Sequence, residues 1–329
     1  MTTDDMPSKE QVLILHDGDL TQTVRMLAAA RRIRAYHPKA RVTLLCGPDF
    51  EGLLKHCVYF NAVEPTLPDL AQKGFFERRK LARASQFDVV YDLDGGDAAQ
   101  KVRRALSFSS TRWIRALPEP AGRGHPLDLV AARLGEAGLG QTHYALGEAP
   151  GPEVDWIDFV AKRSRTLEPA YFGLQGPYAL FTPAGDDVKP ALRWPKERWA
   201  SLAHQILEAG IEPTIIGGPN AREVGRYIAH VAPGARDLTG RANLVQLAGL
   251  GRKANFAFGE DVGLLHLIVA TGAPAVMFSP GEDAPHFDAP RGRHPTLLMH
   301  APTLAQISVA EAVQAMRFAG GFANAPEAA

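Results

Sequence analysis

Residues 256–278 read FAFGEDVGLLHLIVATGAPAVMF, and this stretch decides the fold. Residues 256–258 form a short apolar run that predicts a strand, and residues 264–271 have the continuous apolar character of a buried helix. Gly259 and Gly263 flank the few residues between them and favour a tight loop, while residues 275–278 predict the next strand. Strand, loop, helix and strand in this order are the repeating unit of a parallel sheet covered by helices.

The same alternation extends over most of the chain. Further strands are predicted at 11–15, 42–46, 62–64, 89–93, 178–182 and 213–216, and helices at 23–36, 154–165, 197–209, 222–231 and 243–249. A chain of 329 residues has room for two α/β domains of roughly 150 residues each. We expect two Rossmann-like domains, residues 1–166 and 167–329, with mostly parallel, doubly wound sheets that face a central cleft. Ligands of such sheets bind beyond the carboxyl ends of the strands.

Composition narrows the class of protein. Hydrophobic residues make up 46% of the chain and charged residues 22%, as in ordinary globular proteins. Cys46 and Cys57 are the two cysteines, too few for a disulfide framework. Asp4 and Asp5 stand where a secretory signal carries positive charge, so we expect a cytoplasmic protein.

Charge is unevenly distributed although the net charge is zero. Residues 25–115 hold 17 Lys and Arg against 9 Asp and Glu. No nucleic-acid-binding module accompanies this basic region, so we predict an anionic, membrane-bound or phosphorylated substrate and no nucleic acid. A solvated basic helix face is the alternative interpretation.

The motifs favour transfer chemistry on a diphosphate. The sequence holds no GxGxxG, Walker, HExxH or GxSxG motif in a fitting context. The backbone N–H groups around Gly263, at a loop and a helix start, suit a bound diphosphate, and His266 follows one turn later. Alternatively, Asp261 caps the helix and His266 packs in the core.

Five segments in order resemble glycosyltransferase family nine, the ADP-heptose:lipopolysaccharide heptosyltransferases. They are FTPAG at 181–185, RWPKERW at 193–199, GGP at 217–219, DLTG at 237–240 and DVGLLH at 261–266. The first half is similar more faintly, at residues 11–15, 37–45 and 87–93. The resemblance implies the GT-B fold, a cytoplasmic role in lipopolysaccharide biosynthesis, and no cofactor or metal ion. Asp92 and Asp94 are therefore interpreted as a coincidence and not as a metal site.

The resemblance also implies where the nucleotide sugar binds. The second domain would hold the donor, with ADP-heptose as the expected molecule, and the first an anionic glycolipid acceptor, with peripheral contact to the inner membrane surface. The implied donor-binding residues are Thr182, Ala184, Gly185, Lys189, Arg193, Glu223, Asp261, Val262, Gly263 and His266.

Two positions depart from the family pattern. The family's first loop ends in Gly-Asp, whose Asp is the general base, but ungapped alignment puts Gln22 there, and an amide takes no proton at neutral pH. Asp19 and Asp17, on the same loop, are the candidate bases, with Asp19 favoured; turn formation is the alternative role of both. The family's phosphate-binding Lys corresponds to Leu192, for which Lys189 or Arg193 would substitute.

We therefore expect an inverting, metal-independent glycosyltransferase that moves a sugar, a heptose by resemblance, to a lipopolysaccharide-core-like acceptor. A second hypothesis is a catalytically weakened relative that acts as a sugar-nucleotide-binding or scaffold module. A third is a nucleotide-sugar epimerase of the same fold.

Overall fold

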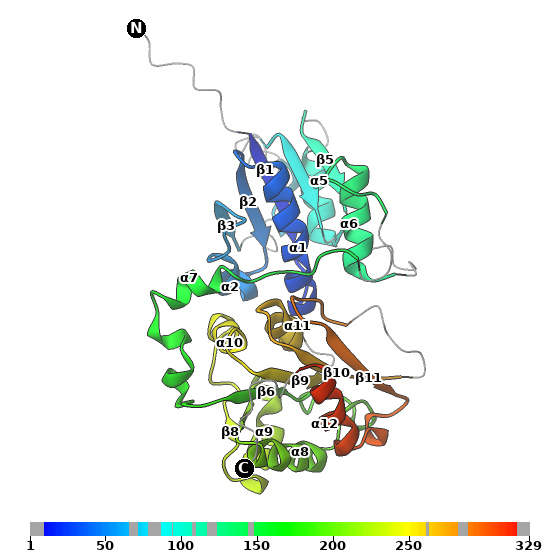
Figure 1. The fold of residues 1–329 in the computed structure, drawn as a ribbon. Helices are drawn as coiled ribbons and strands as arrows, with labels where there is room; N and C mark the ends of the chain where they lie inside the picture. Colours follow the sequence, from blue (N-terminus) through cyan, green and yellow to red (C-terminus); the bar gives the residue numbers. More distant parts are fainter. Residues whose placement is uncertain are drawn as a thin grey trace. The chain divides into compact units, whose positions relative to one another are not determined.

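The computed structural model describes residues 10–65, 72–77, 87–93, 95–106, 110–116, 124–143, 148–260, 263–281 and 289–320 (Figure 1). Its contacts divide the chain into two units, Met1–Ala149 and Pro150–Ala329. Each unit has its own parallel sheet. The predicted α/β class is confirmed in both.

The sheet of the first unit has five parallel strands in the order β3-β2-β1-β4-β5. The strands are β1 (Gln11–His16), β2 (Arg41–Cys46), β3 (Ala62–Glu64), β4 (Val89–Asp92) and β5 (Arg112–Arg115). The second to fifth residues of β1, VLIL, are all buried. A central strand covered on both faces needs this unbroken apolar run and not an alternation of apolar and polar residues.

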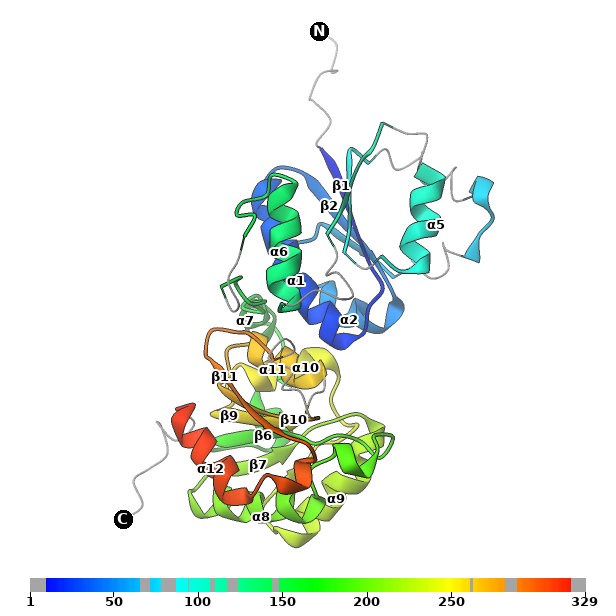
Figure 2. The same ribbon diagram turned by 90° about the vertical axis from the view of Figure 1, so that its right-hand side faces the viewer.

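Helices cover both faces of this sheet, as Figure 2 shows. They are α1 (Leu20–Tyr36) and α6 (Pro126–Glu136) on one face and α5 (Asp97–Leu106) on the other, with the short α2 (Glu51–Leu54) after β2. Leu13 and Leu15 of β1 pack with Ala99 and Val102 of α5. Because side chains alternate along a strand, these two residues share one face of the sheet.

The sheet of the second unit has six parallel strands in the order β11-β10-β9-β6-β7-β8. They are β6 (Tyr178–Thr182), β7 (Glu212–Ile215), β8 (Arg236–Asp237), β9 (Phe256–Glu260), β10 (Ala275–Pro280) and β11 (Thr296–Ala301). The helices are α7 (Ile157–Ala161), α8 (Lys196–Glu208), α9 (Arg222–Val231), α10 (Leu244–Gly251), α11 (Gly263–Ala270) and α12 (Val309–Phe318). The strand-and-helix unit predicted over residues 256–278 is confirmed.

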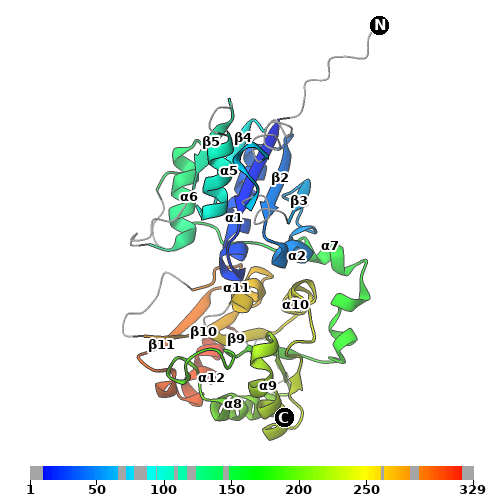
Figure 3. The same ribbon diagram turned by 180° about the vertical axis from the view of Figure 1, so that it is seen from behind.

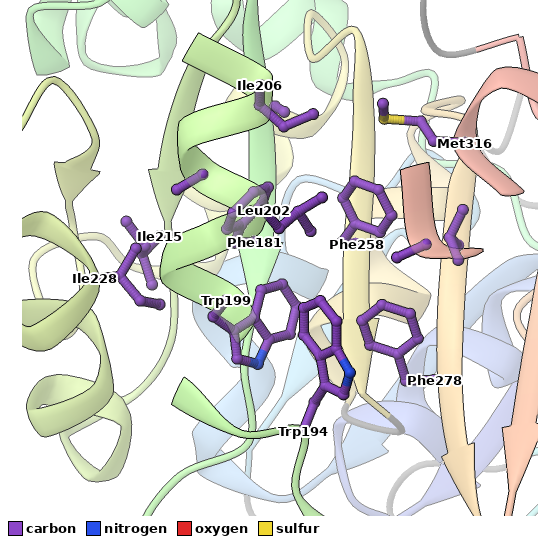
Figure 4. Close-up of a cluster of buried hydrophobic side chains, with 14 of the residues drawn as sticks. Phe181, Trp194, Trp199, Leu202, Ile206, Ile215, Ile228, Phe258, Phe278 and Met316 are labelled. Carbon is purple, nitrogen blue, oxygen red and sulfur yellow. The ribbon is translucent and has the colours of Figure 1, made fainter. Parts of the chain in front are cut away.

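Two apolar cores lie on opposite faces of the second sheet. Helices α10 and α11 cover one face, and α8, α9 and α12 cover the other (Figure 3). On the α8 side the rings of Phe181, Trp194, Trp199, Phe258 and Phe278 form one cluster (Figure 4). The ring centroids of Trp194 and Phe278 are 4.7 Å apart, and those of Trp194 and Trp199 are 5.1 Å apart. Such tilted and edge-to-face pairs add to the energy of apolar burial.

The segment between the sheets differs from the sequence expectation. A single helix was predicted at 154–165, but the structure has only the five residues of α7 followed by a short 3₁₀ turn, Arg165–Leu167. Val154, Trp156, Ile157 and Leu167 are buried, and Val154 N donates to Ala270 O. Residues 150–166 therefore pack as part of the second unit, although the sequence pattern placed them in the first.

Candidate functional site

The order of the strands in the second unit changes direction at one place. From β6 the chain continues to β7 and β8 on one side, and then crosses to β9, β10 and β11 on the other. The loops after β6 and β9 leave the carboxyl edge in opposite directions, and such switch points are where parallel sheets bind ligands. The residues after Thr182 and after Glu260 are thus the first candidates for a site.

The loop after β9 leads directly into a helix. β9 ends at Glu260 and α11 begins at Gly263; Asp261 and Val262, both expected donor-binding residues, lie outside the described residues. The N–H groups of the first turn of α11 have no partner within the helix, and the helix dipole makes this end favourable for an anion. His266 is 3% exposed, in the buried face of α11.

The loop after β6 is fixed by buried contacts. The Thr182 hydroxyl is fully buried and donates to Phe258 O at 3.4 Å. The N–H of Ala184 donates to Glu260 Oε2 at 2.5 Å. A Cβ on Gly185 would come within 2.5 Å of Asn220 Nδ2, so the side chain of Asn220, in the turn before α9, packs directly against this glycine. Thr182 and Ala184 therefore shape the loop with groups that already have partners.

Two cations lie further along this loop. Arg193 is half-buried and donates to Asp186 Oδ1 at 2.7 Å, which fixes its guanidinium. Lys189 is exposed and forms no ion pair with any residue that the structure describes. Leu192, which the resemblance sets against the family's Lys, is 41% exposed. Arg193 and Lys189 are thus the basic groups that this loop offers to a phosphate.

Glu223 lies in the first turn of α9, next to the loop that follows β7. Its side chain is 70% exposed, and its Oε1 is 3.6 Å from Lys196 Nζ. The Lys196 ammonium also lies 4.8 Å from the centroid of the Tyr227 ring. An exposed ion pair of this kind contributes little to stability, so the carboxylate stays available to hydroxyl groups.

Glu260 is a residue of the site that sequence reasoning missed. It is 3% exposed, and its two oxygens accept from Ala184 N and Trp194 N, each at 2.5 Å. Burial raises the pKa of Glu260 to about 7, although the backbone N–H groups of Trp194 and Ala184 oppose the shift. The signal was present in the sequence, since an acidic residue ends the apolar strand FAFGE.

The first unit has a switch point of its own. β1 and β4 are neighbours, and the chain leaves them toward β2 and β5 on opposite sides. The loop after β1 is only three residues long because α1 begins at Leu20. Asp19 is the N-cap of α1, with Oδ1 accepting from Gln22 N at 2.8 Å, and Gln22 Oε1 accepts from Asp19 N at 2.9 Å. This reciprocal capping box fixes the start of the helix.

The capping box changes the interpretation of Gln22. Ungapped alignment put Gln22 at the end of the first loop, but in the structure it lies inside the first turn of α1. The loop itself ends in Gly18-Asp19, three residues before Thr21-Gln22. Gln22 is thus part of the helix cap, and Asp19 is the last residue of the loop after β1.

Two residues that precede Asp19 in the chain, His16 and Asp17, also hold the loop after β1 in place. Burial and the nearby Asp49 carboxylate raise the pKa of Asp17. A Cβ on Gly47 would lie 2.7 Å from Asp17 Oδ1, so the side chain rests against the residue after β2. His16 is 2% exposed and hydrogen-bonds Thr23 Oγ1 at 3.0 Å, and burial lowers the pKa of its ring to about 4. His16 is therefore neutral at physiological pH, and its hydrogen bond to Thr23 joins the end of β1 to α1.

Metal ligands do not cluster in the part of the chain that the structure describes: no group of three His, Cys, Asp or Glu could hold an ion there. Asp92 Oδ1 accepts from Gly95 N at 2.7 Å and so closes a turn, while Asp94 lies outside the described residues. Among the described helices, none is long and apolar enough to cross a bilayer.

Comparison with known proteins bears directly on the second unit. Residues 143–283 match the family model of glycosyltransferase family 9 (heptosyltransferase). Lipopolysaccharide heptosyltransferase 2 of Escherichia coli (strain K12) is 28% identical over 134 residues, which are 39% of this chain and 38% of that protein. The aligned part thus spans well under half of the curated relative. The predicted resemblance to this family is confirmed.

Solved structures extend the likeness to both units. The glycosyl transferase family 9 protein of Veillonella parvula DSM 2008 has a TM-score of 0.75 at 15% identity, covering 96% of this chain and 99% of that one. The E. coli heptosyltransferase WaaC with ADP has a TM-score of 0.71 at 20% identity, covering 94% and 99%. The predicted GT-B fold class is confirmed, because these neighbours share the two parallel sheets.

Proposed function

We propose that this protein is a glycosyltransferase that moves a heptose from ADP-heptose to a lipopolysaccharide-core-like acceptor, with inversion and without a metal ion. One observation carries the proposal. The segment that matches the family, residues 143–283, contains both loops of the β6–β9 switch point, where a parallel sheet binds its ligand. The WaaC enzyme has been solved with ADP and with ADP-2-deoxy-2-fluoro heptose, which supports the choice of donor.

In this proposal the second unit holds the donor. The diphosphate lies at the N-terminus of α11, at Gly263, where backbone N–H groups and the helix dipole favour negative charge. Lys189 and Arg193 supply positive charge from the loop after β6. Glu223 accepts hydrogen bonds from the ribose hydroxyls, a role that suits its exposed carboxylate. Asp261, Val262 and His266 complete the site by resemblance.

Catalysis in this proposal needs a base on the acceptor hydroxyl. Asp19 ends the loop after β1, and one of its oxygens, Oδ1, is occupied by the N–H of Gln22. Its other oxygen makes no hydrogen bond to any described residue and accepts the proton. The acceptor oxygen then forms a bond to the anomeric carbon as the bond to the diphosphate breaks, and a single displacement inverts the configuration. ADP leaves with its charge stabilised by N–H groups and cations.

A glycolipid acceptor also fits the charge of the first unit. The excess of basic residues over 25–115 would attract an anionic core oligosaccharide. We place this reaction in the cytoplasm, with peripheral contact between the protein and the inner membrane surface.

A second candidate function is a binding or scaffold module. The observation that favours it is the capping box, because a side chain that serves as an N-cap is accounted for without catalysis. Leu192 at the family's Lys position favours it as well.

The discriminating experiment titrates the protein with ADP-heptose in a calorimeter and then measures ADP formation with and without a lipopolysaccharide-core acceptor. Binding followed by acceptor-dependent ADP formation supports the enzyme. Binding without turnover supports the module, and no binding at all refutes both.

A further inference from the structure

The loop after β6 is closed by a single side chain from a different strand. Glu260, the last residue of β9, accepts from Ala184 N with Oε2 and from Trp194 N with Oε1. Both bonds are 2.5 Å long, and the carboxylate is buried. The two N–H groups mark the beginning and the end of the segment that carries Lys189 and Arg193. One carboxylate thus ties the two ends of this segment together.

The end at Trp194 is also fixed from the other side. Its indole lies in the aromatic cluster of Figure 4, and its Nε1 donates to Ile307 O at 2.9 Å. Because both the backbone and the ring of Trp194 have fixed partners, the adjacent Arg193 is attached to a rigid part of the core. The positive charge of the Arg193 guanidinium favours the ionised form of Glu260, and the guanidinium donates a hydrogen bond to Asp186 Oδ1.

Burying an acidic side chain at the end of a strand costs free energy. The other large residues of β9, Phe256 and Phe258, are apolar, so Glu260 is the acidic residue of an otherwise apolar buried strand. Removing a carboxylate from water is unfavourable unless strong hydrogen bonds replace the lost hydration. Here the two charge-assisted bonds to backbone N–H groups replace part of it, and burial still raises the pKa of Glu260 to about 7. The carboxylate and the loop therefore satisfy each other.

We propose that Glu260 is a positioning residue of the donor site, whose ionised carboxylate pins residues 184 and 194 and so holds Lys189 and Arg193 where a diphosphate can meet them. This inference rests on the proposed function. Glu260 itself does not touch the donor in this arrangement, because both of its oxygens point to the loop backbone.

The test uses Glu260→Gln in the full chain at pH 8, above the pKa of about 7, where the wild-type carboxylate is ionised. Glutamine has the same shape but only one acceptor oxygen, so one of the two N–H groups must face an NH₂ group. We expect amide hydrogen exchange at Ala184 and Trp194 to become at least roughly tenfold faster, and the Kd for ADP-heptose to rise by roughly tenfold.

The matched control is Tyr178→Phe, at the opposite end of β6. It removes one buried bond in the same unit, from the Tyr178 hydroxyl to Leu250 O at 2.6 Å, and leaves the loop intact. Exchange at residues 184 and 194 and the Kd should then stay near the wild-type values.

Two outcomes would overturn the inference: unchanged exchange at both amides in Glu260→Gln, or a loosened loop with unchanged donor affinity. If wild-type protein binds no ADP-heptose at all, the proposed function fails, and a loop that stays closed in Glu260→Gln would refute the pinning independently.

Discussion

Replacing Asp19 with asparagine separates its structural role from its proposed catalytic one. The Asp19 carboxylate caps α1 through a single oxygen, which accepts from Gln22 N at 2.8 Å. Asparagine is as good an N-cap as aspartate and keeps this oxygen, so Asp19→Asn should change the free energy of unfolding by no more than a few tenths of a kcal/mol. It removes the proton acceptor, however, and a lost general base lowers turnover by roughly 10² to 10⁴.

Asp19→Ala completes the comparison, because alanine supplies neither the cap nor the base. It should lose the same activity and in addition about 1 kcal/mol of stability. The assay is ADP formation from ADP-heptose with acceptor present, and the stability measurement is urea unfolding of the same preparations. Asp17→Asn serves as the matched loop variant, two residues away.

Three results are possible for this set. Loss of turnover in Asp19→Asn with normal unfolding supports the assignment. Loss in Asp17→Asn with full activity in Asp19→Asn moves the base to Asp17. If neither asparagine variant loses turnover while Gln22→Asp gains orders of magnitude, the natural protein is a weakened enzyme or a binding module, and the reasoning is refuted.

Three further predictions concern the donor site. Gly263→Val should weaken nucleoside-diphosphate binding at least tenfold, roughly 1.4 kcal/mol, because a branched side chain at the start of α11 obstructs close approach of phosphate to the backbone; unchanged affinity in a folded variant contradicts the site. Turnover should persist in excess EDTA, since N–H groups and cations stabilise the leaving ADP, whereas a loss that Mg²⁺ or Mn²⁺ restores would contradict the mechanism. The pKa of Glu260, raised from 4.5 to about 7, means that the folded state holds a proton which the unfolded state releases, so this residue's contribution to stability is present below pH 4.5 and is lost as the pH rises to 7. Over this window the wild type should lose on the order of 3 kcal/mol relative to Glu260→Gln in urea unfolding, and parallel pH profiles would contradict the shift.

Local patterns in the sequence predicted most elements that are held by their own apolar periodicity. The runs at 11–15, 178–182 and 256–258 became central strands, since a strand buried on both faces must be apolar throughout. The helix predicted at 154–165 shows the limit of such reasoning. The segment packs instead against α10, which α7 and the 3₁₀ turn contact, and against α11, where Val154 N donates to Ala270 O, and only this packing decides its path.

The sequence by itself determined that Gly263 opens a helix after a strand, and that Lys189, Arg193 and Glu223 lie on loops or helix starts at carboxyl ends of strands. Only the tertiary structure decided which of these groups already have hydrogen-bond or ion-pair partners within the protein. Glu260 and Ala184 are 76 positions apart in the chain, and Glu260 and Trp194 are 66 apart, yet one carboxylate joins them. No local pattern encodes that bond, because strand order brings β9 beside β6, and strand order depends on the packing of the whole sheet.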